Sequence, residues 1–172
     1  MKTCTFVLTV LAISIAAPAL AQDKSALPSS GNFKIHSGWK SIGESVQLGE
    51  NHNYGSGNFW GVTYNDAGRG PLHMGAVVCP YTLDMISGAG TAQGTCSWGD
   101  SDNDKIFTPW SGKLSPSSPF EGTFTITGGT GKYKGITGKE PFACISKPTP
   151  AGEPEGAFAI DIPHITTWEI KG

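Results

Sequence analysis

The sequence has no long stretch without glycine or proline. Its 172 residues include 24 Gly and 12 Pro, and after residue 21 the longest uninterrupted run is the nine residues from Asp100 to Thr108. An average helix takes about 11–12 residues, and glycine and proline are the least favourable residues in its interior. Helices of ordinary length are therefore excluded from this part of the chain, and short strands separated by turns are expected.

The sequence also has little charge and no excess of positive charge. Only 15% of its residues are charged, and 12 basic against 14 acidic residues give a net charge of −2. Nucleic-acid binding through phosphate contacts needs a basic excess, so we expect no nucleic-acid partner. The four histidines, at positions 36, 52, 73 and 164, lack the spacing of a zinc site. We therefore expect neither a metal nor a cofactor.

A long apolar run occurs only at the N-terminus. Lys2 precedes an apolar segment from Phe6 to Ala17, and Ala19-Leu20-Ala21 has the small-x-small pattern of a signal cleavage site. We predict a signal peptide at residues 1–21, a flexible leader at 22–31 and one β domain at 32–172. The apolar run is too short to remain as a membrane anchor. The protein is therefore expected in the periplasm or the medium, with no membrane attachment after signal removal.

Export changes how the cysteines are interpreted, because disulfides form in oxidising compartments. Cys4 lies in the predicted signal peptide, which leaves Cys79, Cys96 and Cys144. Cys79 and Cys96 lie 17 positions apart around a turn-like segment at residues 87–90, so a hairpin would bring them together and leave Cys144 as a buried thiol. The alternatives are a pair that includes Cys144, or a role for one cysteine as a nucleophile.

Several segments alternate apolar and polar residues with the period of a half-buried strand. This pattern is clear in residues 33–39 and 120–126. In residues 72–85 it changes phase at Pro80, which predicts a β-bulge on a bent strand. Closing strands are expected at residues 142–146, 156–162 and 165–170. A total of about eight or nine strands favours a barrel or a sandwich.

A dense glycine motif, GGTGKYKGITG, spans Gly128 to Gly138. It is not a phosphate loop, because Ile126 stands where the first glycine belongs and Tyr133 stands at the Ser/Thr position. It also fails the dinucleotide pattern, since Lys134 replaces the third glycine. We therefore expect a tight connection in which glycines supply positive φ angles.

Together with the preceding strand, this motif resembles the signature of allene-oxide-cyclase-like and dirigent-like barrels. The segment from Phe124 to Gly138 reads FTITGGTGKYKGITG, and in that superfamily such a segment joins two barrel strands. The segment from Gly94 to Phe107 is similar to secreted bacterial members, in which a Gly-x-Cys strand leads to an Asp-rich turn. The resemblance implies one antiparallel barrel of about eight strands, closed or nearly closed, and it also suggests a homo-oligomer. It implies no particular reaction, so no active-site residue is transferred.

Few side chains are candidates for chemistry. Asp100, Asp102 and Asp104 lack the glycine and glutamate of a calcium loop, and we expect them to form a solvated turn. Glu44 shares the parity of Val46 and Leu48, so it is the one carboxylate that could face an apolar lumen as an acid or base. The alternative is that Glu44 lies at a rim or strand end.

The aromatic residues lead to the functional hypotheses. Trp39, Trp60 and Trp98 lie on expected strands and are candidates to line the lumen, the alternative being ordinary core packing. The first hypothesis is an exported barrel that binds a small apolar or aromatic molecule. The second is a cyclase or isomerase that shapes a reactive substrate in the lumen. The third is a structural or interaction protein with a filled barrel.

Overall fold

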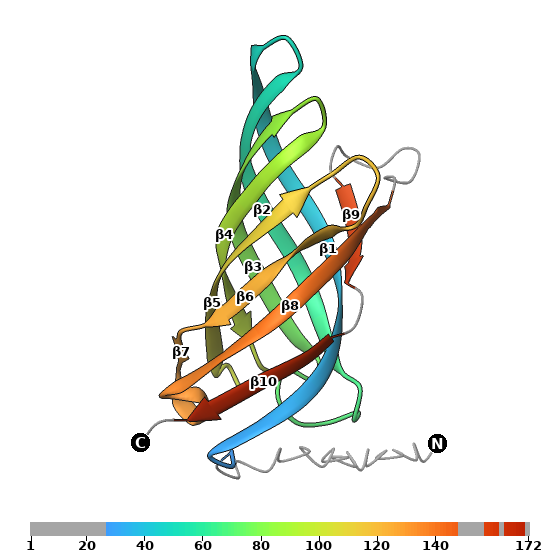
Figure 1. Cartoon of the computed structure of the whole chain (residues 1–172). Coiled ribbons are helices and arrows are strands. Elements are labelled where there is room, and N and C mark those ends of the chain that lie inside the picture. The colour runs from blue at the N-terminus through green and yellow to red at the C-terminus, as the bar shows by residue number, and fades with distance from the viewer. Residues whose placement is uncertain (1–26, 148–156, 162–163, 171–172) are drawn as a thin grey trace, which may run out of the picture.

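Ten β-strands pair into one antiparallel sheet that closes on itself (Figure 1). The computed structural model describes residues 27–147, 157–161 and 164–170, and the predicted signal peptide lies outside them. The elements in chain order are β1 (Ser30–Gly49), β2 (His52–Asn65), β3 (Gly75–Ile86), β4 (Ala89–Gly99), β5 (Lys105–Leu114), β6 (Phe120–Ile126), β7 (Gly128–Gly129), the 3₁₀ turn η1 (Gly131–Tyr133), β8 (Ile136–Lys147), β9 (Ala157–Asp161) and β10 (His164–Ile170). β1 begins at Ser30, so the first strand takes up the last two residues of the predicted leader.

The ring closes because two short strands share one position. Strands β1 to β6 and then β8 are neighbours in that order, and β9 and β10 both lie between β8 and β1. β10 pairs with β1 at residues 30–35, whereas β9 pairs with β1 at residues 38–41. The hydrogen bonds therefore pass through a ring of eight strands. The predicted all-β, nearly closed antiparallel barrel is confirmed, and no helix in the described ranges is long and apolar enough to span a bilayer.

Alternate side chains of each strand fill the barrel. On β1 the inward residues include Phe33, Ile35 and Trp39, as the alternation predicted, and all three are buried. On β2 and β3 the odd positions also point inward, whereas on β4, β5, β6 and β8 the even positions do so. This alternation of inward and outward residues is the period of two of a pleated strand.

The predicted β-bulge at Pro80 is wrong. The odd residues of β3 point inward without interruption from Val77 through Tyr81 to Met85, and the pairing of β3 with β2 keeps one register throughout. The pattern misled because outward residues such as Ala76 and Val78 are also apolar. Leu72 and Met74 precede the strand, and both have positive φ angles.

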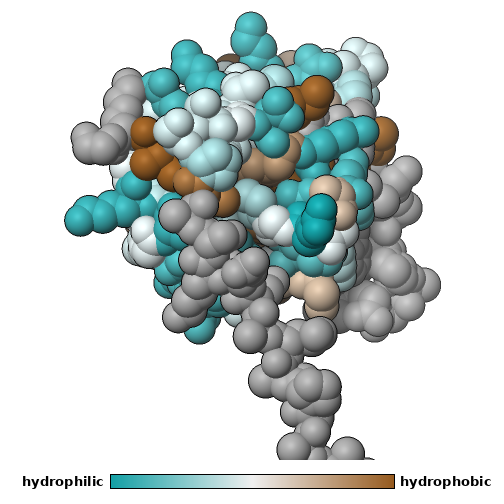
Figure 2. Space-filling view, turned by 90° about the horizontal axis from the view of Figure 1, so that it is seen from below, coloured by the Kyte–Doolittle hydropathy of each residue, from teal (hydrophilic) through white to brown (hydrophobic). Residues whose placement is uncertain are grey.

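The two ends of the barrel differ. The β1–β2 and β3–β4 hairpins extend well beyond the other strands at the end drawn uppermost in Figure 1, here called the upper end. The lower end carries η1 and the connection between β2 and β3. Seen from below, the face outside the grey atoms is largely hydrophilic, with hydrophobic residues toward its edges (Figure 2).

The glycine motif and the Asp-rich turn form one network at the lower end. Tyr133 is completely buried, and its hydroxyl donates a hydrogen bond to Asp100 Oδ2. The ammonium group of Lys132 lies 2.6 Å from Asp102 Oδ2 and 3.1 Å from Asp100 Oδ2. Leu72 N donates a third hydrogen bond to Asp100 Oδ2, at 3.2 Å. The aspartates therefore hold the glycine motif in place and are not a purely solvated turn.

This network sets the charge states of its members. Burial acts to raise the pKa of Asp100, but the hydrogen bonds from Tyr133 and Lys132 outweigh it and leave the pKa below its usual value. The pKa of Tyr133 is raised, first by burial and then by its bond to Asp100. Tyr133 therefore remains a neutral donor to an ionised carboxylate, which is the strong form of such a bond.

Candidate functional site

A cavity of about 280 Å³ lies inside the upper part of the barrel. Its floor lies at the level of Trp39 and Phe124, and its wall rises along β3 to Leu83 and Met85, toward the tip of the β3–β4 hairpin. The lining side chains come from seven strands, and they are Trp39, Ser41, Phe59, Cys79, Tyr81, Leu83, Met85, Ala92, Trp110, Leu114, Phe120, Phe124, Phe142 and Cys144.

The wall of the cavity is mainly aromatic. Phe59 stacks on Tyr81 with ring centroids 4.4 Å apart, and Phe124 lies 4.6 Å from Phe142. Trp110 contacts Phe120 edge to face, at 5.8 Å. These ring pairs fix one another's orientation. The wall of the cavity is therefore built from mutually packed aromatic rings.

One polar group interrupts this apolar wall. Ser41 Oγ and the Tyr81 hydroxyl share a hydrogen bond of 2.8 Å, in which either oxygen can be the donor. Two hydroxyls that share one hydrogen bond retain a second proton and free lone pairs. The pair can therefore both donate to and accept from a ligand. None of the lining residues is charged.

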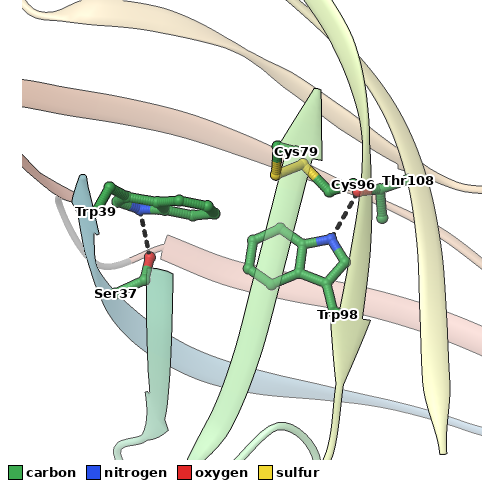
Figure 3. Close-up of a disulfide and its surroundings, with 6 residues drawn as sticks. All are labelled: Ser37, Trp39, Cys79, Cys96, Trp98 and Thr108. Atoms are coloured by element: carbon green, nitrogen blue, oxygen red, sulfur yellow. Dashed lines mark hydrogen bonds between the residues drawn. A yellow bond between two sulfur atoms is a disulfide. The ribbon is translucent and has the colours of Figure 1, made fainter. Parts of the chain in front are cut away.

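The interior below the cavity is filled. Trp98 is almost completely buried, and its ring meets Trp39 at 5.5 Å and Phe124 at 5.1 Å, edge to face in both cases. Trp98 Nε1 donates to Thr108 Oγ1 at 2.7 Å, and Trp39 Nε1 donates to Ser37 Oγ at 2.9 Å (Figure 3). Both indoles are thus held by a hydroxyl on their own or the neighbouring strand.

The predicted disulfide is present between Cys79 and Cys96, with Cα atoms 4.1 Å apart (Figure 3). It joins β3 to β4 at directly facing positions, and Cys79 also lines the cavity. Cys144 keeps its thiol. It is half-buried, not fully buried as expected, because it lies on the cavity wall near the upper end of β8.

The three predicted tryptophans lie in three different environments. Trp39 lines the cavity, and Trp98 packs beneath its floor. Trp60 points outward from β2 and is 54% exposed, so it does not line the lumen. The outer face of β2 is itself apolar here, because Trp60, Val62 and Tyr64 all project from it, so an aromatic residue on this strand need not face the lumen.

Glu44 does not face the lumen either. It is exposed on the outer face of β1, where the lumen-facing residues are the odd-numbered ones such as Trp39 and Ser41. Glu44 does lie on the same face of β1 as Val46 and Leu48, as their parity predicted. That face is the outer one, since Val46 and Leu48 are apolar residues that remain exposed on the long hairpin.

The buried carboxylate of the barrel wall is instead Glu140, which sequence analysis did not identify. It lies on β8 opposite Phe124 and is only 5% exposed. Glu140 is two positions before Phe142 and four before Cys144, so the alternation of the strand would have predicted that it points inward like them. Glu140 is not among the residues that line the cavity.

Comparisons with known proteins give no assignment. Neither the protein-family models, nor the curated proteins, nor the solved structures contain a significant match to this chain. Among the described residues, no group of three or more histidine, cysteine or acidic side chains is arranged to hold a metal ion.

Proposed function

We propose that this chain is an exported barrel of the allene-oxide-cyclase-like and dirigent-like type that binds a small uncharged aromatic or apolar molecule in its upper cavity. The observation that carries the proposal is the presence of this cavity in the upper barrel. The lower barrel is packed with buried side chains such as Trp98, while the upper barrel encloses about 280 Å³ between aromatic rings. A barrel of eight strands has room either for a filled interior or for one small ligand.

The size and lining of the cavity restrict the ligand. Pockets for drug-sized molecules span about 300–1,000 Å³, so a cavity of about 280 Å³ fits a smaller molecule, of one or two rings. An ionised group would lose its hydration without gaining an opposite charge, and that costs several kcal/mol or more. An uncharged ligand is therefore favoured.

The Ser41–Tyr81 pair adds one polar contact. A ligand with a single hydroxyl or carbonyl group can bond to this pair while its ring lies among Phe59, Trp110 and Phe142. Such a contact gives orientation and selectivity within an otherwise apolar pocket.

The enzymatic alternative has less support. Glu44 points away from the cavity, and Glu140 is not part of the lining. A general acid or base must come within hydrogen-bond reach of the proton that it transfers. Binding without chemistry therefore fits the site better than a cyclase or isomerase reaction.

A titration with three matched probes tests this proposal. Naphthalene, 1-naphthol and 1-naphthoate share one ring system. They differ in their substituent, which is absent in the first, a neutral hydroxyl in the second and a charged carboxylate in the third. We expect both neutral probes to quench tryptophan fluorescence saturably, with 1-naphthol binding more tightly and 1-naphthoate at least about tenfold more weakly. Tyr81→Phe should reduce the affinity for 1-naphthol and leave that for naphthalene nearly unchanged.

A cavity-filling variant provides the control. Ala92 is buried in the cavity wall on β4, so Ala92→Phe should abolish binding of both neutral probes. Trp60→Phe, on the outer face, should not affect binding. Equal affinity in wild type and Ala92→Phe, or no binding of any probe, would overturn the proposal.

A further inference from the structure

The wall of the upper cavity contains a nucleophile that binding alone does not use. Cys144 lies on β8, is half-buried and lines the cavity with its thiol. Cys79 lines the same cavity, but its sulfur is bonded to Cys96. A thiol forms bonds to carbon through its thiolate, and a sulfur in a disulfide has no such form. Cys144 is therefore the lining residue that can react with a bound molecule.

The same wall contains a buried donor without an acceptor. Trp110 on β5 is only 5% exposed, and its Nε1 atom has no hydrogen-bond partner among the described residues. Of the four buried side chains in the described ranges with such an unpaired atom, Trp110 alone lines the upper cavity. An unpaired buried donor is costly and calls for an explanation. Because an indole N–H can only donate, a ligand that satisfies it must present an acceptor such as a carbonyl oxygen.

The donor and the thiol border one part of the cavity. Phe120 directly faces Cys144 in the pairing of β6 with β8, and its ring meets that of Trp110 edge to face at 5.8 Å. Only β6 separates their strands in the ring. The nitrogen edge of Trp110 lies beside Gly94 on β4, where a Cβ atom would come within 2.9 Å of Nε1. The neighbouring strand therefore places no side chain against this N–H group.

We propose that Cys144 captures an uncharged α,β-unsaturated carbonyl compound covalently, while Trp110 Nε1 donates a hydrogen bond to its carbonyl oxygen. Such a compound carries both features that the wall calls for, an acceptor oxygen for the indole and an electrophilic carbon for the thiol. The inference rests on the proposed function, because it needs a small uncharged ligand in the upper cavity. It adds the chemical class of that ligand.

The reaction is a conjugate addition, and water is the only other molecule that takes part. The Cys144 thiol gives its proton to water, and the thiolate sulfur forms a bond to the β-carbon of the ligand. The electron pair of the C=C bond shifts toward the carbonyl oxygen, and a proton from water then adds to the α-carbon. The net change is addition of S–H across the double bond, with no oxidation and no leaving group. Trp110 favours this step, because a fixed donor stabilises the negative charge that develops on the oxygen.

N-Phenylacrylamide and N-phenylpropanamide form a matched pair of probes, because they share a ring and a carbonyl group and only the first has the reactive double bond. Intact-mass measurement and peptide mapping should find one N-phenylacrylamide on Cys144, and none in Cys144→Ser. The rate should saturate with probe concentration and, at low concentration, exceed that of N-acetylcysteine by about tenfold or more. N-Phenylpropanamide should bind saturably, form no adduct and slow the reaction of the first probe.

The role of the indole N–H is tested by Trp110→Phe, which should slow adduct formation by about tenfold or more. Trp60→Phe makes the same substitution on the outer face of β2 and should leave the rate unchanged. Benzyl bromide alkylates thiols and has no carbonyl group. It should therefore react with Cys144 at similar rates in wild type and in Trp110→Phe, which separates loss of the hydrogen bond from altered access to the thiol.

The outcomes distinguish this inference from the proposed function. Saturable binding of N-phenylpropanamide without any adduct from N-phenylacrylamide would overturn covalent capture and leave the binding cavity supported. Absence of binding by both probes would overturn both. An adduct that forms no faster than with N-acetylcysteine, or equally fast in Trp110→Phe, would show that Cys144 is merely an accessible thiol, and the inference would again be wrong.

Discussion

Tyr133 and Asp100, both buried and 33 residues apart in the chain, are joined by a side-chain hydrogen bond. The bond connects the glycine motif to the turn after β4. Together with the contacts of Lys132, it explains why these two unusual segments occur in one sequence. The turn provides the carboxylates of Asp100 and Asp102, and the glycine motif provides the hydrogen-bond donors Tyr133 and Lys132.

Removal of this hydrogen bond should destabilise the barrel without changing its packing. In Tyr133→Phe the ring stays, but a bond to a charged group is lost, at a cost of about 1.5–3 kcal/mol. For a domain of this size we expect the Tm to fall by roughly 5 °C or more. Tyr64→Phe, at an exposed tyrosine, should change the Tm by less than about 1–2 °C. Equal effects of both substitutions would contradict the account.

Acid should weaken the same network. Burial acts to raise the pKa values of Asp100 and Asp102, but both are below the usual value. At Asp100 the hydrogen bonds from Tyr133 and Lys132 outweigh burial, and at Asp102 those from Lys132 and from the backbone N–H of Asp104 do so. A carboxylate with a lowered pKa stabilises the fold above its unfolded pKa, near 4, and loses that contribution as the pH falls further. We therefore expect the Tm difference between wild type and Asp102→Asn to be largest at neutral pH and to shrink between about pH 4 and pH 2. A difference that does not vary with pH would exclude this origin.

The glycine motif should tolerate no side chain at Gly131. This residue has φ +51°, and a Cβ atom there would lie 1.8 Å from Asp104 Oδ1. Backbone strain alone costs about 1–2 kcal/mol, and Asp104 must move as well. Gly131→Ala is therefore expected to lower the free energy of unfolding by about 2 kcal/mol or more in urea titrations. Gly38→Ala, where the space is open, should have little effect, and a similar loss at both sites would argue against the clash.

Sequence patterns predicted the barrel and the disulfide because both depend on local signals. The turn at Ser87 and Gly88 places Cys79 opposite Cys96 once β3 and β4 pair. The same patterns failed to say which face of a strand is inside. Trp60 and Glu44 were placed inward because β1 and β2 carry apolar residues on their outer face as well.

The contacts that join distant segments could not be predicted. The bond between Tyr133 and Asp100 depends on how β4 and β6 are placed across β5, and no local pattern contains that information. Glu140 was missed because the expected closing strand began at Phe142, whereas β8 begins at Ile136.

Thiol labelling should separate the three cysteines of the barrel domain. Under native, non-reducing conditions a small maleimide should label Cys144 alone, since Cys79 and Cys96 are bonded to each other. Bound 1-naphthol should slow that reaction, because Cys144 lines the cavity. Reduction should lower the Tm by several degrees, as the 17-residue loop is worth roughly 3 kcal/mol. Labelling of Cys79 without reductant would show that this disulfide is absent.

The two methionines of the barrel domain allow the most direct test of the proposed binding cavity. Met85 lines the cavity, whereas Met74 lies outside it and is 69% exposed. In protein labelled with ¹³C at the methionine methyl groups, titration with 1-naphthol should shift the NMR signal of Met85 saturably and leave that of Met74 in place. No shift of Met85 at saturating probe, or a larger shift of Met74, would contradict a ligand site inside the barrel.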